Sequence, residues 1–221
     1  MSESTDNYLK AIFSLSEPNC EHVTTTALAE KMQTKASSVT DMLKKLDSRG
    51  YVKHTRYYGV ALTAKGKKQA LNIVRKHRLW ELFLVEKLGF GWNEVHEIAE
   101  QLEHVESDAL VKKLDKYLGH PKYDPHGDPI PDASGVLPSG RKTLSAYAMK
   151  ENETYAIAAV SDDSESFLNH LKSLKLQLGT AIKLLERYPF DNSMRVETNH
   201  AVINLSKSVA DNLILQKAKK R

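Results

Sequence analysis

Cysteine is almost absent from this sequence: Cys20 is the single cysteine among 221 residues. One cysteine can form neither an internal disulfide nor a zinc site built from several thiolates. A chain without disulfides fits a reducing compartment, so we expect a cytoplasmic protein. Hydrophobic residues make up 41% and charged residues 27%, which is ordinary for a globular protein.

Long apolar runs are lacking as well. No stretch approaches the roughly 20 apolar residues that cross a bilayer. The first residues, MSESTDNYLKAIF, are polar and acidic, whereas a signal peptide begins basic and then turns apolar. We therefore expect neither a signal peptide nor a membrane partner.

The net charge of +4 conceals two regions of opposite sign. Residues 31–78 contain thirteen Lys and Arg but two Asp, whereas residues 81–118 contain nine acids and four bases. The basic region predicts a polyanion partner, because neutralising phosphates releases counterions. The acidic region is typical of a protein that binds cations.

Proline is scarce and concentrated, since five of the seven prolines lie in residues 120–140. That composition indicates a loop and domain boundary. Helical spacing of apolar residues precedes the loop. After Leu144 the pattern predicts short strands over residues 154–160, 180–190, 193–199 and 200–206. We predict a mainly α chain with a smaller β domain, a five-stranded barrel, and three domains: residues 1–75, 76–143 and 144–221.

The first of these domains has the pattern of a winged helix-turn-helix. Its first helix is expected to begin after a cap at Thr5 or Asp6. Two more helices and a hairpin follow, expected over residues 23–32, 36–50 and 51–63. Two helices joined by a short turn, followed by a hairpin, make this DNA-binding motif.

The second helix of such a motif enters the major groove with its first turn facing the bases. Small groups that permit close approach lie in that turn here: Ala36, Ser37, Ser38, Thr40 and Asp41. Nearby side chains suit phosphates: Lys35, Lys44, Lys45, Arg49, Lys53, Arg56 and Tyr57. The alternative is a winged helix used for protein contacts, which the basic excess disfavours.

Residues 96–108, HEIAEQLEHVESD, contain two histidines and five acidic side chains. The pattern of residues 93–119 predicts one long helix or a pair of helices. On a single helix, four metal-capable side chains would share an arc of roughly 100°: His96, Glu100, Glu103 and His104. His77 and Glu81 are likewise spaced i, i+4. Each group taken alone could also be a solvated charged face.

Three motifs in order, RKHRLWELFL, VHEIAEQLEHVESD and DPHGDPIP, follow the winged-helix stretch ASSVTDMLKKLDSRGYV. Together they resemble the diphtheria-toxin-repressor family of metal-dependent transcription regulators, over nearly the whole chain. The resemblance implies a helical metal-binding and dimerisation domain, an SH3-like C-terminal domain similar to ferrous transport protein A, a homodimer and a DNA operator. It also implies a principal metal site at Asn7, His77, Glu100, Glu103 and His104.

The resemblance implies a second metal site as well, at Glu81, His96, Asp124, His126 and an acid near Asp162 or Asp163. For His126 the alternative is a turn histidine beside Gly127. Asn7 departs from the family pattern, in which manganese-type members usually carry Asp and iron-type members Met. The oxygen-rich, thiolate-free set favours Mn²⁺, with Fe²⁺ as the alternative.

Enzymes fit these motifs less well. HEIAE nearly matches the zinc-protease pattern H-E-x-x-H, but Glu100 stands in place of the second histidine. A di-iron carboxylate bundle needs the motif Glu-x-x-His on separate helices, but Gln101 stands three residues before His104. A winged-helix repressor that senses a small molecule would not need the ligands or the DPHG loop. We therefore predict a non-enzymatic Mn²⁺-dependent regulator that represses metal-uptake genes and takes no small organic substrate.

Overall fold

The computed structural model describes residues 2–16, 22–55 and 58–218. They form two compact units. The first contains the chain up to His77 with Glu100–Lys113 and Pro131–Leu137, and the second contains Arg78–Ala99, Leu114–Ile130 and the chain from Pro138. Among the described residues, no helix has both the length and the apolar character needed to cross a bilayer.

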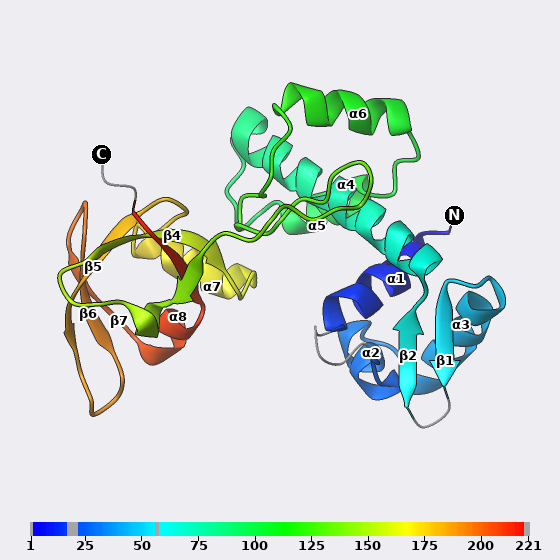
Figure 1. Cartoon of the computed structure of the whole chain (residues 1–221), viewed down its shortest axis with the longest axis horizontal. Coiled ribbons are helices and arrows are strands. Elements are labelled where there is room, and N and C mark those ends of the chain that lie inside the picture. Colours follow the sequence, from blue (N-terminus) through cyan, green and yellow to red (C-terminus); the bar gives the residue numbers. More distant parts are fainter. Residues whose placement is uncertain (1, 17–21, 56–57, 219–221) are drawn as a thin grey trace. The chain divides into compact units, whose positions relative to one another are not determined.

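A winged helix-turn-helix opens the first unit (Figure 1). Its elements are α1 (Glu3–Leu15), α2 (Thr25–Lys31), α3 (Ala36–Ser48), β1 (Val52–Thr55) and β2 (Gly59–Leu62). The Thr24 side chain caps α2 by accepting a hydrogen bond from the Ala27 amide. Apolar side chains from the three helices and the hairpin share one core: Leu9, Ile12, Leu28, Val39, Leu43, Leu46, Val52 and Val60. The predicted winged helix is confirmed.

The start of α1 differs from the prediction. The helix begins at Glu3, and the Ser2 carbonyl accepts hydrogen bonds from the amides of Thr5 and Asp6. Thr5 and Asp6 are therefore buried residues of the first turn and not caps. The Asp6 carboxylate accepts a hydrogen bond from Gln69 Nε2 at 3.2 Å, which gives this buried charge a polar partner.

The long helix α4 (Ala64–Leu88) agrees with its apolar periodicity. Of the two alternatives for residues 93–119, a pair of helices is the one that forms, because α5 (His96–Leu102) ends before Glu103 and α6 (Asp108–Tyr117) starts afresh. The Ser107 hydroxyl accepts a hydrogen bond from the Leu110 amide at 3.3 Å and so caps α6. Acidic residues near the C-terminus of α5 also lie at the negative end of the helix dipole, which disfavours extending the helix further.

The second unit contains a β domain with a six-stranded antiparallel sheet in the order β3-β8-β4-β5-β6-β7. The strands are β3 (Thr143–Ser145), β4 (Thr154–Val160), β5 (Ala181–Arg187), β6 (Met194–Thr198), β7 (Val202–Leu205) and β8 (Leu213–Lys217). A short 3₁₀ helix, η1 (Ala146–Ala148), and two α-helices, α7 (Glu165–Ser173) and α8 (Lys207–Asp211), complete the domain.

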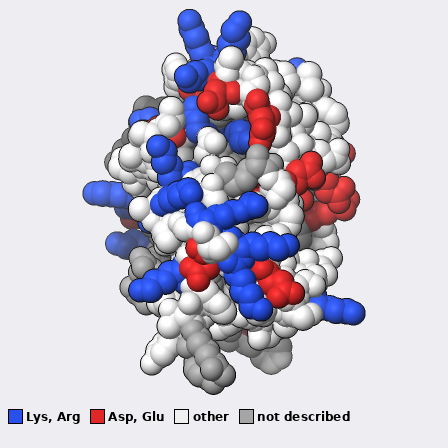
Figure 2. Space-filling model, turned by 90° about the vertical axis from the view of Figure 1, so that its right-hand side faces the viewer, with Lys and Arg blue, Asp and Glu red and all other residues white. Residues whose placement is uncertain are grey.

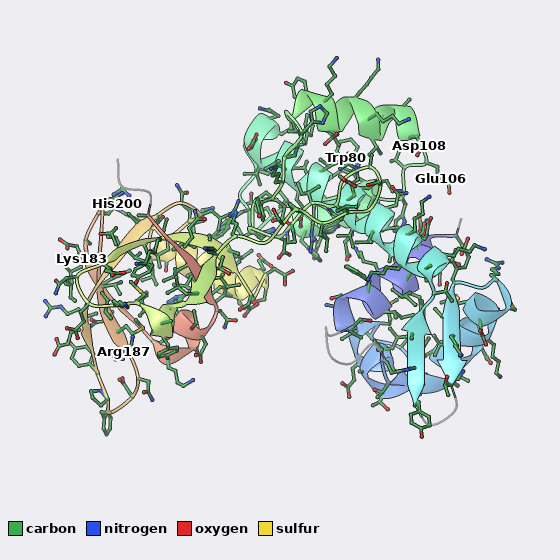
Figure 3. The ribbon with its side chains drawn as sticks, in the orientation of Figure 1. Trp80, Glu106, Asp108, Lys183, Arg187 and His200 are labelled. Atoms are coloured by element: carbon green, nitrogen blue, oxygen red, sulfur yellow. The ribbon has the colours of Figure 1, made fainter. Side chains whose placement is uncertain are left out.

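This sheet has one strand more than predicted. Both β3 and β8 escaped the sequence pattern, since β3 has three residues and β8 pairs with β3 and β4 from far earlier in the chain. On β5 the expected alternation holds, because Ile182 and Leu184 are buried while Lys183 between them is not (Figure 3). The sheet therefore buries one apolar face, against α7 and α8.

Candidate metal centres and DNA-binding face

Two ligands of the first predicted set, His77 and His104, lie beside a third, Glu103, which directly follows α5 and is fully buried. Nδ1 of His77 on α4 lies 2.6 Å from Glu103 Oε2, and Nε2 of His104 lies 3.9 Å from Oε1. His104 Nδ1 is buried and has no hydrogen-bond partner within the described part of the chain. The turn after α5 thus directs the Glu103 carboxylate toward His77 and places the His104 imidazole beside that carboxylate.

A lysine that sequence reasoning did not select lies in the middle of this first set. Nζ of Lys10, on α1, lies 2.8 Å from the Glu103 carboxylate and 3.3 Å from Glu100 Oε1. Asn7 is half-buried and lies one turn before Lys10 on the same helix, so both point from one face of α1. Its role as a ligand stays a prediction.

The donors of the first set suit a divalent metal ion. Carboxylate oxygens and imidazole nitrogens are the usual ligands of Mn²⁺, Fe²⁺ and Zn²⁺. The buried Glu103 carboxylate requires positive partners, and the buried His104 Nδ1 is a donor atom that no described residue uses. We therefore keep Asn7, His77, Glu100, Glu103 and His104 as the residues that would hold the ion.

The second predicted set is gathered more tightly. Ligand atoms of Glu81, Asp124 and His126 lie within 4.8 Å of one another, and all three residues are buried. His96 Nδ1 lies 3.4 Å from Glu81 Oε1. Asp162 is not part of this cluster of described residues, and its Oδ1 accepts a hydrogen bond from the Ser164 amide ahead of α7.

Backbone contacts hold the DPHG loop that carries two of these ligands. Asp124 Oδ1 accepts hydrogen bonds from the amides of His126 and Asp128, at 2.8 and 2.9 Å. The His126 carbonyl accepts a hydrogen bond from the Val160 amide on β4. Gly127 has φ +90°, and a Cβ there would collide with the Ala158 carbonyl oxygen, so the close approach to β4 requires glycine. His126 lies in a turn beside Gly127 and is buried.

Burial and neighbouring charges shift the pKa values of both loop ligands. Burial, with Glu81 and Asp128, raises the pKa of Asp124 to about 7 against the opposing effect of His126 and Arg78. Burial lowers the pKa of His126, but the hydrogen bond and charge of Glu81, together with Asp124 and the Trp92 carbonyl, raise it overall to about 9. Because the metal-binding imidazole must be neutral, binding at His126 would release a proton.

The orientation of His126 suits a ligand. Its Nε2 lies 2.8 Å from the Trp92 carbonyl oxygen, which can only accept, so Nε2 carries a proton in the charged and in the neutral imidazole. Nδ1 then faces Glu81 Oε2 at 3.7 Å. A carbonyl that fixes the tautomer of an imidazole is a common support for metal-binding histidines.

The predicted DNA-contacting residues of α3 lie outside its buried face, which consists of Val39, Leu43 and Leu46. All are exposed except the half-buried Thr40: Lys35, Ala36, Ser37, Ser38, Thr40, Asp41, Lys44 and Lys45. Figure 2 looks onto the side of the winged helix and shows Lys and Arg side chains gathered there. Arg56 and Tyr57 lie outside the described residues.

Three family models match successive parts of the chain. They are the iron dependent repressor N-terminal DNA binding domain over residues 1–60, the iron dependent repressor metal binding and dimerisation domain over 63–132, and the FeoA domain over 143–217. A solved manganese-dependent transcriptional repressor in complex with manganese is 35% identical, with a TM-score of 0.83 over 97% of this chain and 100% of that one.

Two characterised repressors are similar as well. The diphtheria toxin repressor of Corynebacterium diphtheriae is 26% identical over 84% of this chain and 85% of that protein. The iron-dependent repressor IdeR of Mycobacterium leprae is 34% identical over 62% of this chain and 58% of that protein. This chain belongs to the diphtheria-toxin-repressor family. It is a member of a family of metal-dependent transcriptional repressors.

In this repressor, sequence reasoning missed Arg78 beside the second set. Arg78 donates hydrogen bonds to the Pro129 carbonyl at 2.6 Å and to Asp128 at 3.2 Å, and its Nε lies 3.5 Å from Asp124. The sequence did contain a signal for this contact, because Arg78 lies one helical turn before the predicted ligand Glu81 on α4.

Trp92 was missed too. Its ring stacks on His126, with centroids 6.1 Å apart and planes at 13°. Nothing in the local sequence pattern links these two residues, because the loop that carries Trp92 lies far from His126 along the chain.

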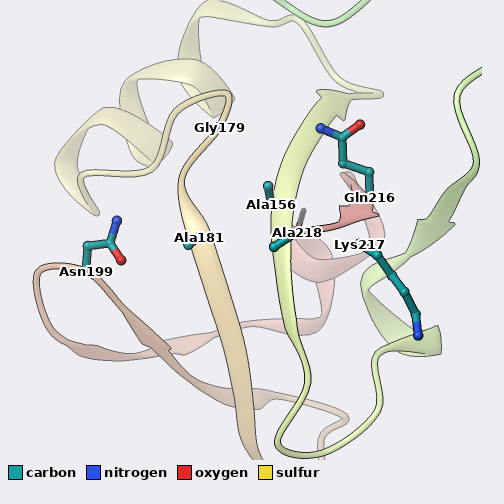
Figure 4. Close-up of a pocket in the computed structure, with 7 residues that line it drawn as sticks. All are labelled: Ala156, Gly179, Ala181, Asn199, Gln216, Lys217 and Ala218. Atoms are coloured by element: carbon teal, nitrogen blue, oxygen red, sulfur yellow. The ribbon is translucent and has the colours of Figure 1, made fainter. Parts of the chain in front are cut away.

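The C-terminal domain of this repressor also has a pocket, which is poor in metal donors (Figure 4). Its lining residues are Ala156, Gly179, Ala181, Asn199, Gln216, Lys217 and Ala218. Nζ of Lys217 pairs with Glu153 at 3.0 Å, and its side chain points away from the other lining residues. Among the lining residues the pocket therefore offers the amides of Asn199 and Gln216, which do not make a metal site.

Proposed function

We propose that this repressor responds to Mn²⁺, represses metal-uptake genes and acts in the cytoplasm as a homodimer on a palindromic operator. Both ligand sets consist of oxygen and nitrogen donors, which suits Mn²⁺ better than softer metals. The similar repressor solved with manganese supports the same assignment. No catalytic reaction is part of the proposal.

The observation that carries the proposal is the position of α1. Through Leu9 and Ile12 this helix belongs to the core of the winged helix. Through Lys10 it also reaches Glu103 and Glu100 in the first ligand set. A change at the ligands can therefore act directly on the DNA-binding fold.

A divalent ion held by Asn7, His77, Glu100, Glu103 and His104 would supply the positive charge that these donors share. Asn7 would contribute an oxygen from α1, and Glu103 and His104 would contribute from the turn after α5. These residues would then restrain α1, and with it α3, in one arrangement. If that arrangement spaces the two recognition helices of a dimer by about one turn of DNA, metal and operator must strengthen each other's binding.

DNA affinity with and without metal tests the proposal. After selection of the operator from a random DNA pool, fluorescence anisotropy would compare Mn²⁺, Fe²⁺, Zn²⁺ and a chelator. We expect chelation to weaken operator binding at least about tenfold, a coupling of roughly 1.4 kcal/mol. Equal affinity under all four conditions would exclude metal regulation, although not DNA binding.

The same experiment separates the second candidate, an Fe²⁺-responsive repressor. That candidate is favoured by the two iron dependent repressor models and by the similarity to IdeR. It predicts that Fe²⁺, under anaerobic conditions, activates DNA binding at lower concentration than Mn²⁺. A repressor that senses a small molecule predicts no response to either ion.

A further inference from the structure

Lys10 is a positive charge built into the first ligand set. Its ammonium lies 2.8 Å from the carboxylate of Glu103 and 3.3 Å from that of Glu100. The Glu103 side chain is 0% exposed, the Glu100 side chain 50% and the Lys10 side chain 20%. The lysine thus enters from a partly open side and ends at the most buried carboxylate.

Glu103 needs such a partner. A buried carboxylate without a positive neighbour is costly, because the low-dielectric interior does not replace its hydration. His77 Nδ1 at 2.6 Å and the Lys10 ammonium are its two close partners on other elements. Of these, Lys10 contributes an ammonium group, whereas an imidazole that binds metal must be neutral.

We propose that Lys10 is a tethered competitor for the metal ion, which neutralises Glu103 and Glu100 until the ion displaces it and so sets the metal concentration at which the repressor responds. This inference rests on the proposed function, since it concerns how the same ligands accept a divalent ion.

The chemistry of lysine makes the displacement feasible. Its charge sits at the end of four flexible methylene groups, so the ammonium can swing outward while the stem stays packed. The partial exposure of Lys10 gives it a route to water. A dication at the same carboxylates would repel the ammonium by several kcal/mol at the dielectric of a protein surface.

Displacement would also change what holds α1. With Lys10 on Glu103, an ion pair links α1 to the turn after α5. With the lysine released, ligation by Asn7 would make that link instead. The same helix face therefore carries both a competitor and a ligand, one turn apart.

Metal-binding isotherms of Lys10→Met decide between this role and a purely structural ion pair. Methionine keeps most of the length of the side chain, removes the charge and is a poor ligand for Mn²⁺. We expect Lys10→Met to bind Mn²⁺ about tenfold more tightly than the wild type by calorimetry. Lys10→Arg, which keeps the charge, should bind like the wild type or more weakly. Lys172→Met, which removes an exposed charge on α7, should leave the isotherm unchanged.

Two further measurements do not depend on repressor activity. Lys10→Met should unfold at a lower temperature than the wild type in chelator, and Mn²⁺ should raise its unfolding temperature by more than it raises that of the wild type. Acylation of amines, read by mass spectrometry, should modify Lys10 of the wild type faster with Mn²⁺ than with chelator.

The outcomes are distinct. If the wild type binds no Mn²⁺, the proposed function fails. If the wild type binds Mn²⁺ but the Lys10→Met isotherm superimposes on it, or binding weakens, the competitor role is wrong while the proposed function stands. If Lys10→Met does not fold in chelator, unchanged acylation of wild-type Lys10 on addition of Mn²⁺ would overturn the inference, and faster acylation would support it.

Discussion

The two ligand sets contain the same kinds of donor but hold their positive charges differently. In the first set, Glu103 contacts Lys10, whose charge is one flexible ammonium. In the second set, Asp124 lies beside Arg78, whose guanidinium is also hydrogen-bonded to the Pro129 carbonyl and Asp128. A forked guanidinium with several partners is fixed, whereas a lysine can leave.

The supporting backbone differs in the same direction. The second set uses a loop fastened by the Asp124 side chain and by the Val160 amide. The first set uses the last turn of α5 and a side chain of the DNA-binding fold. The second set is therefore suited to constant support, and the first to a change that DNA binding can sense.

Removing Arg78 should produce the largest effect on stability. Arg78→Met would leave the Pro129 carbonyl without its donor and Asp124 without its guanidinium. We expect a loss of about 3 kcal/mol in the free energy of unfolding. Urea unfolding should show most of this loss both in chelator and in Mn²⁺, because Arg78 supports the loop in either case.

Arg195→Met, which removes an exposed charge on β6, is the matched control and should change stability little. A loss for Arg78→Met that Mn²⁺ fully restores would mean that Arg78 is as exchangeable as Lys10. The contrast between a fixed and a movable cation would then disappear.

Removing ligands should weaken the metal response more in the first set than in the second. Glu103→Ala or His104→Ala should abolish the gain in operator affinity on adding Mn²⁺, at least about 1.4 kcal/mol, while weak nonspecific DNA binding persists. His126→Ala should retain part of the gain, because the partners of His126 are Glu81, Asp124 and the Trp92 carbonyl, whereas Lys10 on α1 contacts Glu103 and Glu100. Glu97→Ala, on the exposed side of α5, is the control. Fluorescence anisotropy that finds His126→Ala more damaging would reverse this ranking.

The pH dependence of stability should report the charge on His126. Its pKa in the folded protein is about 9, above the ordinary value of 6.5. The folded state therefore holds this proton more tightly than the unfolded state, so the stabilisation is complete below pH 6.5 and is lost as pH rises through about 9.

In chelator, the wild type should accordingly exceed His126→Gln in stability by about 2 to 3 kcal/mol more at pH 7 than at pH 10. Urea unfolding at both pH values measures the difference. The groups that face His126 are Glu81, Asp124 and the Trp92 carbonyl, and all are kept in the variant. A gap that does not narrow toward high pH would show that His126 is neutral in the folded protein.

The winged helix was predictable because each of its helices has a one-sided apolar pattern, as in Val39, Leu43 and Leu46 of α3. The end of α5 was not predictable, because candidate metal ligands with helical spacing continue past Leu102. The start of α6 is marked in the sequence only by its cap, Ser107. Strand β8 was missed for another reason, since its partners β3 and β4 lie far away in the sequence.

The candidate ligands were predictable from residue types and from the resemblance of three motifs to a known family. Lys10 and Arg78 were not, because a search for metal donors passes over basic side chains. Their contacts with Glu103 and Asp124 depend on tertiary packing. Charge compensation at a buried site therefore has to be taken from the structure.

Asn7 gives the smallest and most specific test of the first set. α1 begins at Glu3, so Asn7 lies inside the helix and does not cap it. If its amide oxygen is a ligand, Asn7→Asp adds a negative charge toward the metal and should tighten Mn²⁺ binding roughly two- to fivefold. Asn7→Leu should bind metal but respond poorly in DNA binding, because α1 loses its ligand.

An aspartate at this position would also attract Lys10, one turn away, and the two effects oppose each other. The titration is therefore done for Asn7→Asp alone and together with Lys10→Met, with Asn72→Asp on the exposed side of α4 as the charge control. Ligation predicts that the gain in affinity grows when Lys10 is removed. Superimposable isotherms with and without the aspartate, in both backgrounds, would remove Asn7 from the ligand set and leave Lys10 as the link from α1 to the metal ligands.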